Sequence, residues 1–147
     1  MSYSINFSGK NAGFSDADST WLPLNDNYKE TNLESEQMET NSHWQNMQTL
    51  LSLRKSTEAL MSGDTIIYYY SMENILVIKR GLDIVSLANF GPEIVESLDL
   101  GSLFGEQLCI VLFSSNSDHV IGGEYLLNDF QLNSYEGVVL KFIDEEK

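Results

Sequence analysis

The sequence predicts a mainly β protein whose C-terminal part is an antiparallel β-sandwich. Seven short runs after Gly63 are rich in Ile, Val, Tyr and Phe, the residue types that favour strands. Turn formers such as Gly91-Pro92 and Gly101-Ser102 separate the runs, and no helical periodicity lies between them. Many short strands without intervening helices are typical of antiparallel sandwiches. The predicted strands cover residues 65–71, 74–80, 83–90, 93–98, 107–114, 123–127 and 137–143.

The first two strands are expected to form a hairpin. Only Met72 and Glu73 separate the run 65–71 from the run 74–80. A two-residue connection between β-rich runs indicates an antiparallel pair joined by a tight turn.

A single helix is predicted ahead of the strands, over residues 41–61. Asn41 or Ser42 can cap its start by accepting a hydrogen bond from an unpaired backbone N–H. Gly63 is expected to end it by adopting the left-handed conformation, which costs glycine no Cβ strain. Apolar residues recur every three to four positions and so fall on one helix face: Trp44, Met47, Leu50, Leu51, Leu53 and Leu60.

Residues 1–40 show no sustained periodicity and are rich in Asn, Ser, Asp and Glu. Structureless segments longer than ~12–15 residues are uncommon in compact domains unless they have a function. We therefore expect a long loop that needs another part of a protein to pack against. The layout of loop, helix and strands predicts two parts, residues 1–62 and residues 63–147.

Composition excludes several classes of function. The chain has 147 residues, with 8 Lys+Arg against 22 Asp+Glu and a net charge of −14. Such a charge repels phosphate backbones, and the basic residues form no patch, so nucleic-acid binding is excluded. The 42% of hydrophobic residues suffices for a folded core.

No segment of this sequence has the features of a signal peptide or a membrane span. No apolar run approaches the ~18–20 residues of a transmembrane helix, and the first residues lack a basic region followed by an apolar one. Cys109 is the one cysteine, so it makes no internal disulfide. It lies in the apolar run QLCIVLF, where we expect a buried, unreactive thiol.

The sequence nominates no catalytic, metal or cofactor site. His43 and His119 have no histidine or cysteine partner at metal-ligand spacing, and neither a nucleophile elbow nor a phosphate-binding glycine loop is present. Asn6 begins an N-glycosylation sequon, which matters only in the secretory pathway. The following acidic residues are expected to lie on the solvent-exposed surface: Asp16, Asp18, Glu34, Glu36, Glu39 and the tail 144–146.

Several motifs resemble those of animal α-glucosidases (maltases), which are members of the α-amylase family, glycoside hydrolase family 13. The run NAGFS at residues 11–15, followed by TWLPLNDNYK at 20–29 and TNL at 31–33, is similar to a late segment of these enzymes. LLSLRK at residues 50–55 and VSLANF at 85–90 also fit the family pattern. LNSYEGVVL at residues 132–140 is similar to its L-x-P-Y-E step, with Ser134 where proline is usual.

This resemblance implies an incomplete (β/α)8 barrel ahead of the sandwich. Residues 1–40 would follow the eighth barrel strand, residues 41–62 would be the eighth helix, and residues 64–144 the C-terminal β-sandwich. In the family, the Asp nucleophile, the Glu acid/base and a second Asp precede the NAGFS run. The chain by itself is therefore expected to be catalytically silent and to need no cofactor.

The resemblance also implies partners and a location. The remainder of the barrel is the expected partner, and an α-glucoside substrate is expected only in the full-length enzyme. The family indicates a secreted or extracellular-facing protein, and membrane attachment would need an anchor outside these residues.

Asn11, Phe14 and Trp21 are the candidate site residues. In the complete enzymes their loop lies on the substrate side of the barrel, where they could help to wall a sugar pocket. The favoured interpretation is that they fold the loop onto itself and onto the barrel rim. For Trp44, Met47, Leu51 and the tyrosines at 68, 69 and 70, packing in a core or a domain interface is expected.

Two other interpretations stay open at this point. The glycosidase-like heavy chain of heteromeric amino-acid transporters carries a similar signature, and there the fold is a chaperone and partner surface rather than an enzyme. The chain could also be an isolated β-sandwich with a vestigial helix. Fold alone does not separate these functions.

Overall fold

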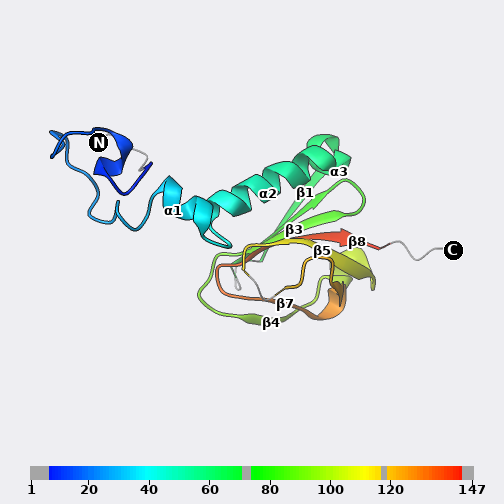
Figure 1. Ribbon diagram of the computed structural model, residues 1–147. Coiled ribbons are helices and arrows are strands. Elements are labelled where there is room, and N and C mark those ends of the chain that lie inside the picture. The colour runs from blue at the N-terminus through cyan, green and yellow to red at the C-terminus, as the bar shows by residue number, and fades with distance from the viewer. Residues whose placement is uncertain (1–6, 71–73, 117–118, 144–147) are drawn as a thin grey trace. The chain divides into compact units, whose positions relative to one another are not determined.

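A computed structural model describes residues 7–70, 74–116 and 119–143. The chain divides into two compact units, Met1–Gln48 and Thr49–Lys147, which are described separately (Figure 1). The boundary expected from the sequence, between residues 62 and 63, stays a prediction about domain architecture.

The first unit contains a short 3-10 turn, η1 (Asn11–Gly13), the helix α1 (Leu33–Met38) and the start of helix α2 (His43–Ser56). A capping box starts α1, because the Asn32 side chain accepts a hydrogen bond from the Ser35 N–H and the Ser35 hydroxyl accepts one from the Asn32 N–H. The expectation of an irregular segment through residue 40 missed α1. Its 6 residues include only Leu33 and Met38 as apolar residues, so no helical period was visible.

The predicted helix exists, but it is broken. Ser42 caps α2, since its hydroxyl oxygen accepts a hydrogen bond from the Gln45 N–H at 3.2 Å, as expected. The prediction of one helix over 41–61 is wrong, because Thr57 is extended (φ −117°, ψ 108°) and a second helix, α3 (Glu58–Ser62), follows it. Packing of α3 on the sheet overrides the helical pattern at this position.

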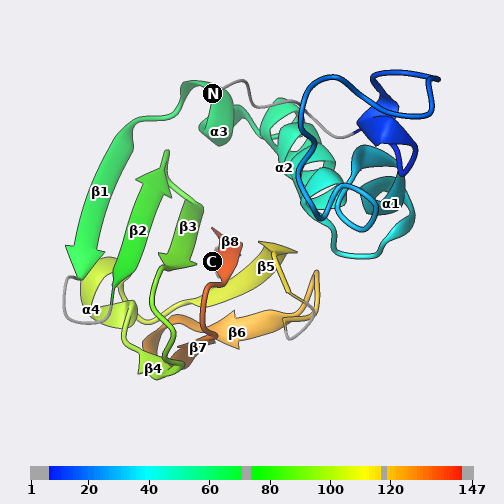
Figure 2. The same ribbon diagram turned by 90° about the vertical axis from the view of Figure 1, so that its left-hand side faces the viewer.

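The second unit is mainly β and antiparallel, as predicted. Its larger sheet has six strands in the order β1-β2-β3-β8-β5-β6, and a second sheet pairs β4 with β7 (Figure 2). A short helix and a 3-10 turn, α4 (Gly101–Phe104) and η2 (Leu127–Asp129), complete the unit. The strands are β1 (Thr65–Tyr70), β2 (Ile75–Arg80), β3 (Ile84–Asn89), β4 (Val95–Leu98), β5 (Leu108–Ser114), β6 (Glu124–Leu126), β7 (Phe130–Leu132) and β8 (Gly137–Phe142).

All seven predicted strands are present, with ends shifted by one or two residues. The hairpin pairing of β1 with β2 is confirmed by the register that places Tyr68 opposite Val77, whereas its turn residues 72–73 lie outside the described residues. Strand β7 was missed, because its 3 residues lie between the turn formers Asn128-Asp129 and Asn133-Ser134.

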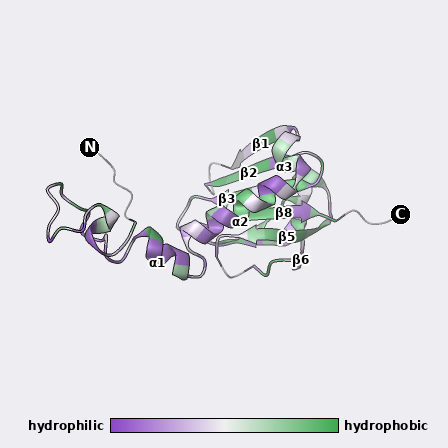
Figure 3. Cartoon of the chain, turned by 45° about the horizontal axis from the view of Figure 1, so that its top comes forward, coloured by the Kyte–Doolittle hydropathy of each residue, from purple (hydrophilic) through white to green (hydrophobic). Residues whose placement is uncertain are grey.

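The main core lies between the two sheets. Leu98 of β4 and Phe130 and Leu132 of β7 pack against the inner face of the larger sheet. Figure 3 shows the strands of the larger sheet as mostly hydrophobic, in contrast to the mixed surface of α2. The larger sheet supplies Ile75, Val77, Val85, Leu87, Cys109, Val111, Val138, Leu140 and Phe142.

The outer face of the larger sheet is covered in part by helix. Ile84, Phe113 and Val139 form a second buried cluster, against which Leu53, Ala59 and Leu60 of α2 and α3 pack. A hydrogen bond also links β2 to α3, because the Arg80 guanidinium donates to the Leu60 carbonyl at 3.0 Å. The C-terminal half of α2 and all of α3 therefore belong to the same packed body as the strands.

Gly63 ends α3 for a different reason from the one expected. Its φ of −66° is not left-handed, so the prediction of a left-handed cap is wrong. A Cβ at this position would lie 2.5 Å from the Ala59 carbonyl oxygen and 2.8 Å from the Gly81 nitrogen. Glycine is required because α3 and the β2–β3 turn approach each other without room for a side chain.

We expect Gly63→Ala to destabilise the protein by about 2 kcal/mol, because the added methyl group must push α3 away from the sheet. Urea unfolding measures the change. Gly137→Ala is the matched control, since its Cβ would make only an ordinary contact, 3.9 Å from the Leu87 carbonyl oxygen. Equal stabilities for the two variants would contradict the close approach.

Candidate functional site

The NAGFS segment is a tightly folded turn in the first unit. The Asn11 side-chain amide donates hydrogen bonds to the carbonyls of Ser15 at 3.1 Å and Ala17 at 2.5 Å. Ala12 is fully buried, and its carbonyl accepts a bond from the Phe7 N–H at 3.0 Å. The Asn11 side chain is therefore used to hold the loop together.

The two aromatic candidates of this loop are open to solvent. Phe14 follows the Asn11 turn directly, through a bond from its N–H to the Asn11 carbonyl at 3.1 Å, and its side chain is half-exposed. Trp21 is 93% exposed. The structure thus brings Asn11 and Phe14 into one turn and leaves Trp21 on the surface. Asn6 lies outside the described residues.

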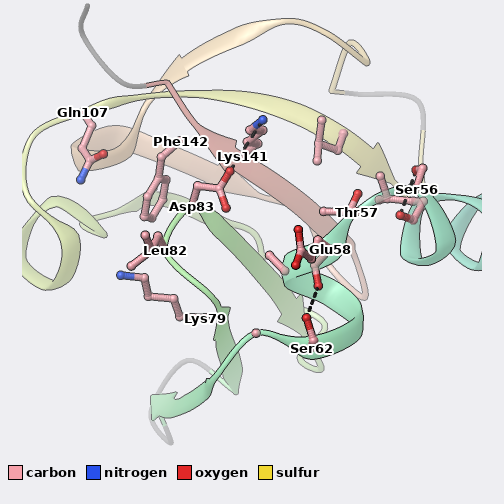
Figure 4. A pocket seen from close by; sticks show the side chains of 14 residues that line it. Ser56, Thr57, Glu58, Ser62, Lys79, Leu82, Asp83, Gln107, Lys141 and Phe142 are labelled. Atoms are coloured by element: carbon pink, nitrogen blue, oxygen red, sulfur yellow. Dashed lines mark hydrogen bonds and ion pairs between the residues drawn. The ribbon is translucent and has the colours of Figure 1, made fainter. Parts of the chain in front are cut away.

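An open groove of about 980 Å³ lies in the second unit (Figure 4). It is formed where α3, the β2–β3 turn, the start of β5 and the end of β8 meet. Its apolar floor and wall include Leu53, Leu112 and Phe142, and Leu82 stands 89% exposed on the turn. We call this surface the α3 groove.

Charged side chains of both signs line the α3 groove. Lys141 forms an ion pair with Asp83 at 3.7 Å, and the Lys79 ammonium lies 5.8 Å from the centre of the Phe142 ring. Glu58 adds a second carboxylate. Within the described residues no His, Cys, Asp and Glu side chains group in a way that could hold a metal ion. The groove has the composition of a contact surface rather than of a reaction centre.

A buried polar cluster, which the sequence analysis did not find, joins the end of β5, the β5–β6 loop and the β7–β8 loop of the second unit. The Glu136 carboxylate accepts hydrogen bonds from the Ser114 hydroxyl at 2.8 Å and the Asn133 N–H at 2.8 Å, and it pairs with His119 Nδ1 at 2.8 Å. Glu136 is 1% exposed and His119 is 7% exposed. The only sequence signal was the YEG step at residues 135–137, which was noted for its resemblance and not for burial.

Aromatic contacts hold the His119 ring in place. It stacks on Phe130 at 4.8 Å with an interplanar angle of 10°, and the Tyr125 ring meets it edge-on at 5.4 Å. A buried carboxylate with this many donors has its hydrogen-bonding capacity satisfied. Loss of one donor would strongly destabilise the folded protein. The cluster therefore fixes the connections at the ends of these strands.

Cys109 is buried, as expected from its apolar run. Burial raises the pKa of the thiol from 9.0 to about 11, against a smaller lowering by a backbone hydrogen bond with Tyr125. The expectation of an unreactive thiol is consistent with this environment.

Apolar residues of α2 and the tyrosines 68, 69 and 70 of β1 were expected to pack in a core or an interface. Tyr68 does pack on the inner core, with its ring 5.8 Å from that of Phe104. The side chains of Tyr69 and Tyr70 lie outside the described part of the structure. Trp44, Met47 and Leu51 are exposed in this chain, and their packing in an interface stays a prediction. None of the described helices is long and apolar enough to span a membrane.

Comparison with known proteins relates the chain to one family. The family model described as "Alpha amylase, catalytic domain" matches residues 5–63. A salivary α-glucosidase of Aedes aegypti is 38% identical over 143 residues, which are 92% of this chain and 24% of the relative. This chain is similar to α-glucosidases of the α-amylase family over nearly all of its length. Maltase 1 of Drosophila virilis is 31% identical over 141 residues, which are 90% of this chain and 21% of that enzyme.

Solved structures of sugar-processing enzymes share the fold of this chain. An inactive double mutant of MutB in complex with isomaltulose matches 95% of this chain and 25% of its own, with a TM-score of 0.79 at 24% identity. Bacillus licheniformis trehalose-6-phosphate hydrolase (TreA) matches 95% of this chain with a TM-score of 0.75 at 23% identity. These four proteins carry enzyme names, so they give no support to the resemblance to transporter heavy chains.

The match covers only a part of the length of each relative. The chain spans about a quarter of the length of the curated relatives, 24% of the Aedes aegypti enzyme and 21% of the Drosophila virilis enzyme. It corresponds to a portion of maltase-like α-glucosidases, and its residues 5–63 match the model of the α-amylase catalytic domain.

The buried thiol makes the protein less stable as the pH rises through the alkaline range. The unfolded chain loses the Cys109 proton near pH 9.0, whereas the native state keeps it until about pH 11. The unfolded state therefore binds fewer protons in this window, and the free energy of unfolding falls as the pH rises, by at most about 3 kcal/mol. Urea unfolding at about pH 8 and about pH 10 should show a smaller decrease for Cys109→Ala than for the wild type. An identical decrease in both proteins would contradict the burial of a protonated thiol.

Proposed function

We propose that this chain supplies the end of the barrel and the C-terminal domain of a maltase-like α-glucosidase. In this proposal residues 1–62 are the last loop and helix of a (β/α)8 barrel, and residues 63–147 are a C-terminal β-sandwich. The chain contributes structure, and the catalytic carboxylates belong to the part of the enzyme that it does not span.

This proposal rests on the unequal coverage of the two aligned chains. The Aedes aegypti relative aligns with 92% of this chain, whereas the chain covers 24% of that relative. A match that is nearly complete on one side and partial on the other is the pattern of one portion of a larger enzyme. The full protein would release terminal α-linked glucose with retention, which requires two carboxylates about 5–5.5 Å apart.

The position of the match supports the division at residue 62. The catalytic-domain model ends at residue 63, where α3 ends and β1 is about to begin. The core between the six-stranded sheet and the β4–β7 pair supports a sandwich for the part that follows. Barrel enzymes carry their chemistry at the C-terminal ends of the barrel strands, so an end segment without those strands lacks the reacting groups.

The loop residues divide by their environment. Asn11 serves the fold of the loop, because both of its amide bonds go to carbonyls of the same loop. Phe14 and Trp21 keep exposed ring faces that could contact either a sugar or the rim of the barrel. We propose contact with the barrel rim for both.

We propose a secreted protein. The Aedes aegypti relative is named a salivary enzyme, and an enzyme of saliva is exported from the cell. Modification of Asn6 by glycan would be a consequence of that route.

The purified 147-residue chain should hydrolyse neither maltose nor p-nitrophenyl α-glucoside, because it lacks the paired carboxylates that the reaction needs. Glucose release is measured across the fractions of a size-exclusion column. Turnover that elutes with the chain itself, rather than with a contaminating enzyme, would overturn the proposal.

A further inference from the structure

We infer that the α3 groove is the surface on which the second unit receives the rest of the α-amylase catalytic domain. The occupant is the polypeptide of that domain that the relatives possess and this chain does not span. The inference rests on the proposed function and names the contact surface for it.

The first step is that a piece of the catalytic domain already packs on this sheet. Residues 5–63 match the catalytic-domain model, and this range includes Leu53, Ala59 and Leu60. These three side chains pack on the outer cluster of Ile84 and its neighbours. An interface between catalytic-domain sequence and the β part therefore exists inside the second unit.

The second step is that the α3 groove continues this interface. Leu53 and Ala59 contact the outer cluster and also line the groove, and so does Leu112 of β5. Figure 4 shows the groove running from α3 past Leu82 and Asp83 toward Phe142 and Gln107. A further segment of the same domain placed beside α3 would fill it.

The third step concerns the chemistry of the groove. Leu82 is an aliphatic side chain that is 89% exposed, and it stands between Lys79 and Asp83 on the β2–β3 turn. An apolar centre with a charged rim of both signs is typical of a surface that binds folded polypeptide.

The charge of the chain argues against a second copy as the occupant. Two chains of net charge −14 repel each other, whereas the groove itself carries Glu58 and Asp83 against Lys79 and Lys141. A balanced groove on an acidic chain suits a partner segment that is mainly apolar with few charges.

The test compares the free chain with a graft. This chain replaces the matching portion of the Aedes aegypti α-glucosidase, and Leu82→Cys introduces a thiol in the groove. Ile121→Cys is the matched control, an aliphatic residue that is 60% exposed in the β5–β6 loop outside the groove. Cys109 is buried and stays unlabelled in both settings. Iodoacetamide labelling is read peptide by peptide by mass spectrometry.

In the free chain both introduced thiols should react at similar rates. In the graft the thiol at position 82 should react at least about tenfold more slowly, because docking removes it from solvent, while the thiol at position 121 should be unchanged. Labelling at position 82 that is as fast in the graft as in the free chain overturns the inference.

Maltose hydrolysis by the graft separates this inference from the proposed function. An active graft in which position 82 labels freely overturns the docking surface alone. A graft in which position 82 is protected but maltose is not hydrolysed supports the docking surface and counts against the proposed function.

Discussion

The arrangement of the second unit depends on the close packing of α3 against the outer face of the six-stranded sheet. Gly63 and Ala59 approach the β2–β3 turn at Gly81 with no room for a further methyl group. Leu53 and Leu60 then bury the outer cluster, which would otherwise face water. This contact joins the last residues of the catalytic-domain match to the β part, so the two behave as one packed body.

The inner core and the polar cluster stabilise the strands independently of the packing of α3. Apolar residues of both sheets fill the space between them, and the buried Glu136 carboxylate accepts hydrogen bonds from the Ser114 hydroxyl and the Asn133 N–H. Because a buried carboxylate without its donors is costly, these bonds hold Ser114 and Asn133 beside Glu136.

The fold was predictable from the sequence wherever a pattern was long enough to show its period. The runs that became β2, β3, β5 and β8 alternate or remain apolar over six or seven residues, and all four were found. Strand β7 and helix α1 were not, because turn formers flank β7 on both sides and α1 contains only two apolar residues. The break at Thr57, the role of Gly63 and the burial of Glu136 depend on residues distant in sequence, and local pattern does not report such contacts. The family resemblance of the NAGFS segment was confirmed by the comparisons, whereas the roles of Phe14 and Trp21 require the part of the enzyme that this chain does not span.

Native-state hydrogen exchange of the 147-residue chain tests most directly whether the end of the catalytic-domain match is one packed body with the strands. Amides of α3 and of residues 50–56 should exchange at least about 100-fold more slowly than those of the loop 16–30, and Gly63→Ala should release them while leaving β3 and β8 protected. Exchange of α3 at the rate of that loop in the wild-type chain would show that the helix does not sit on the sheet, and would contradict this account.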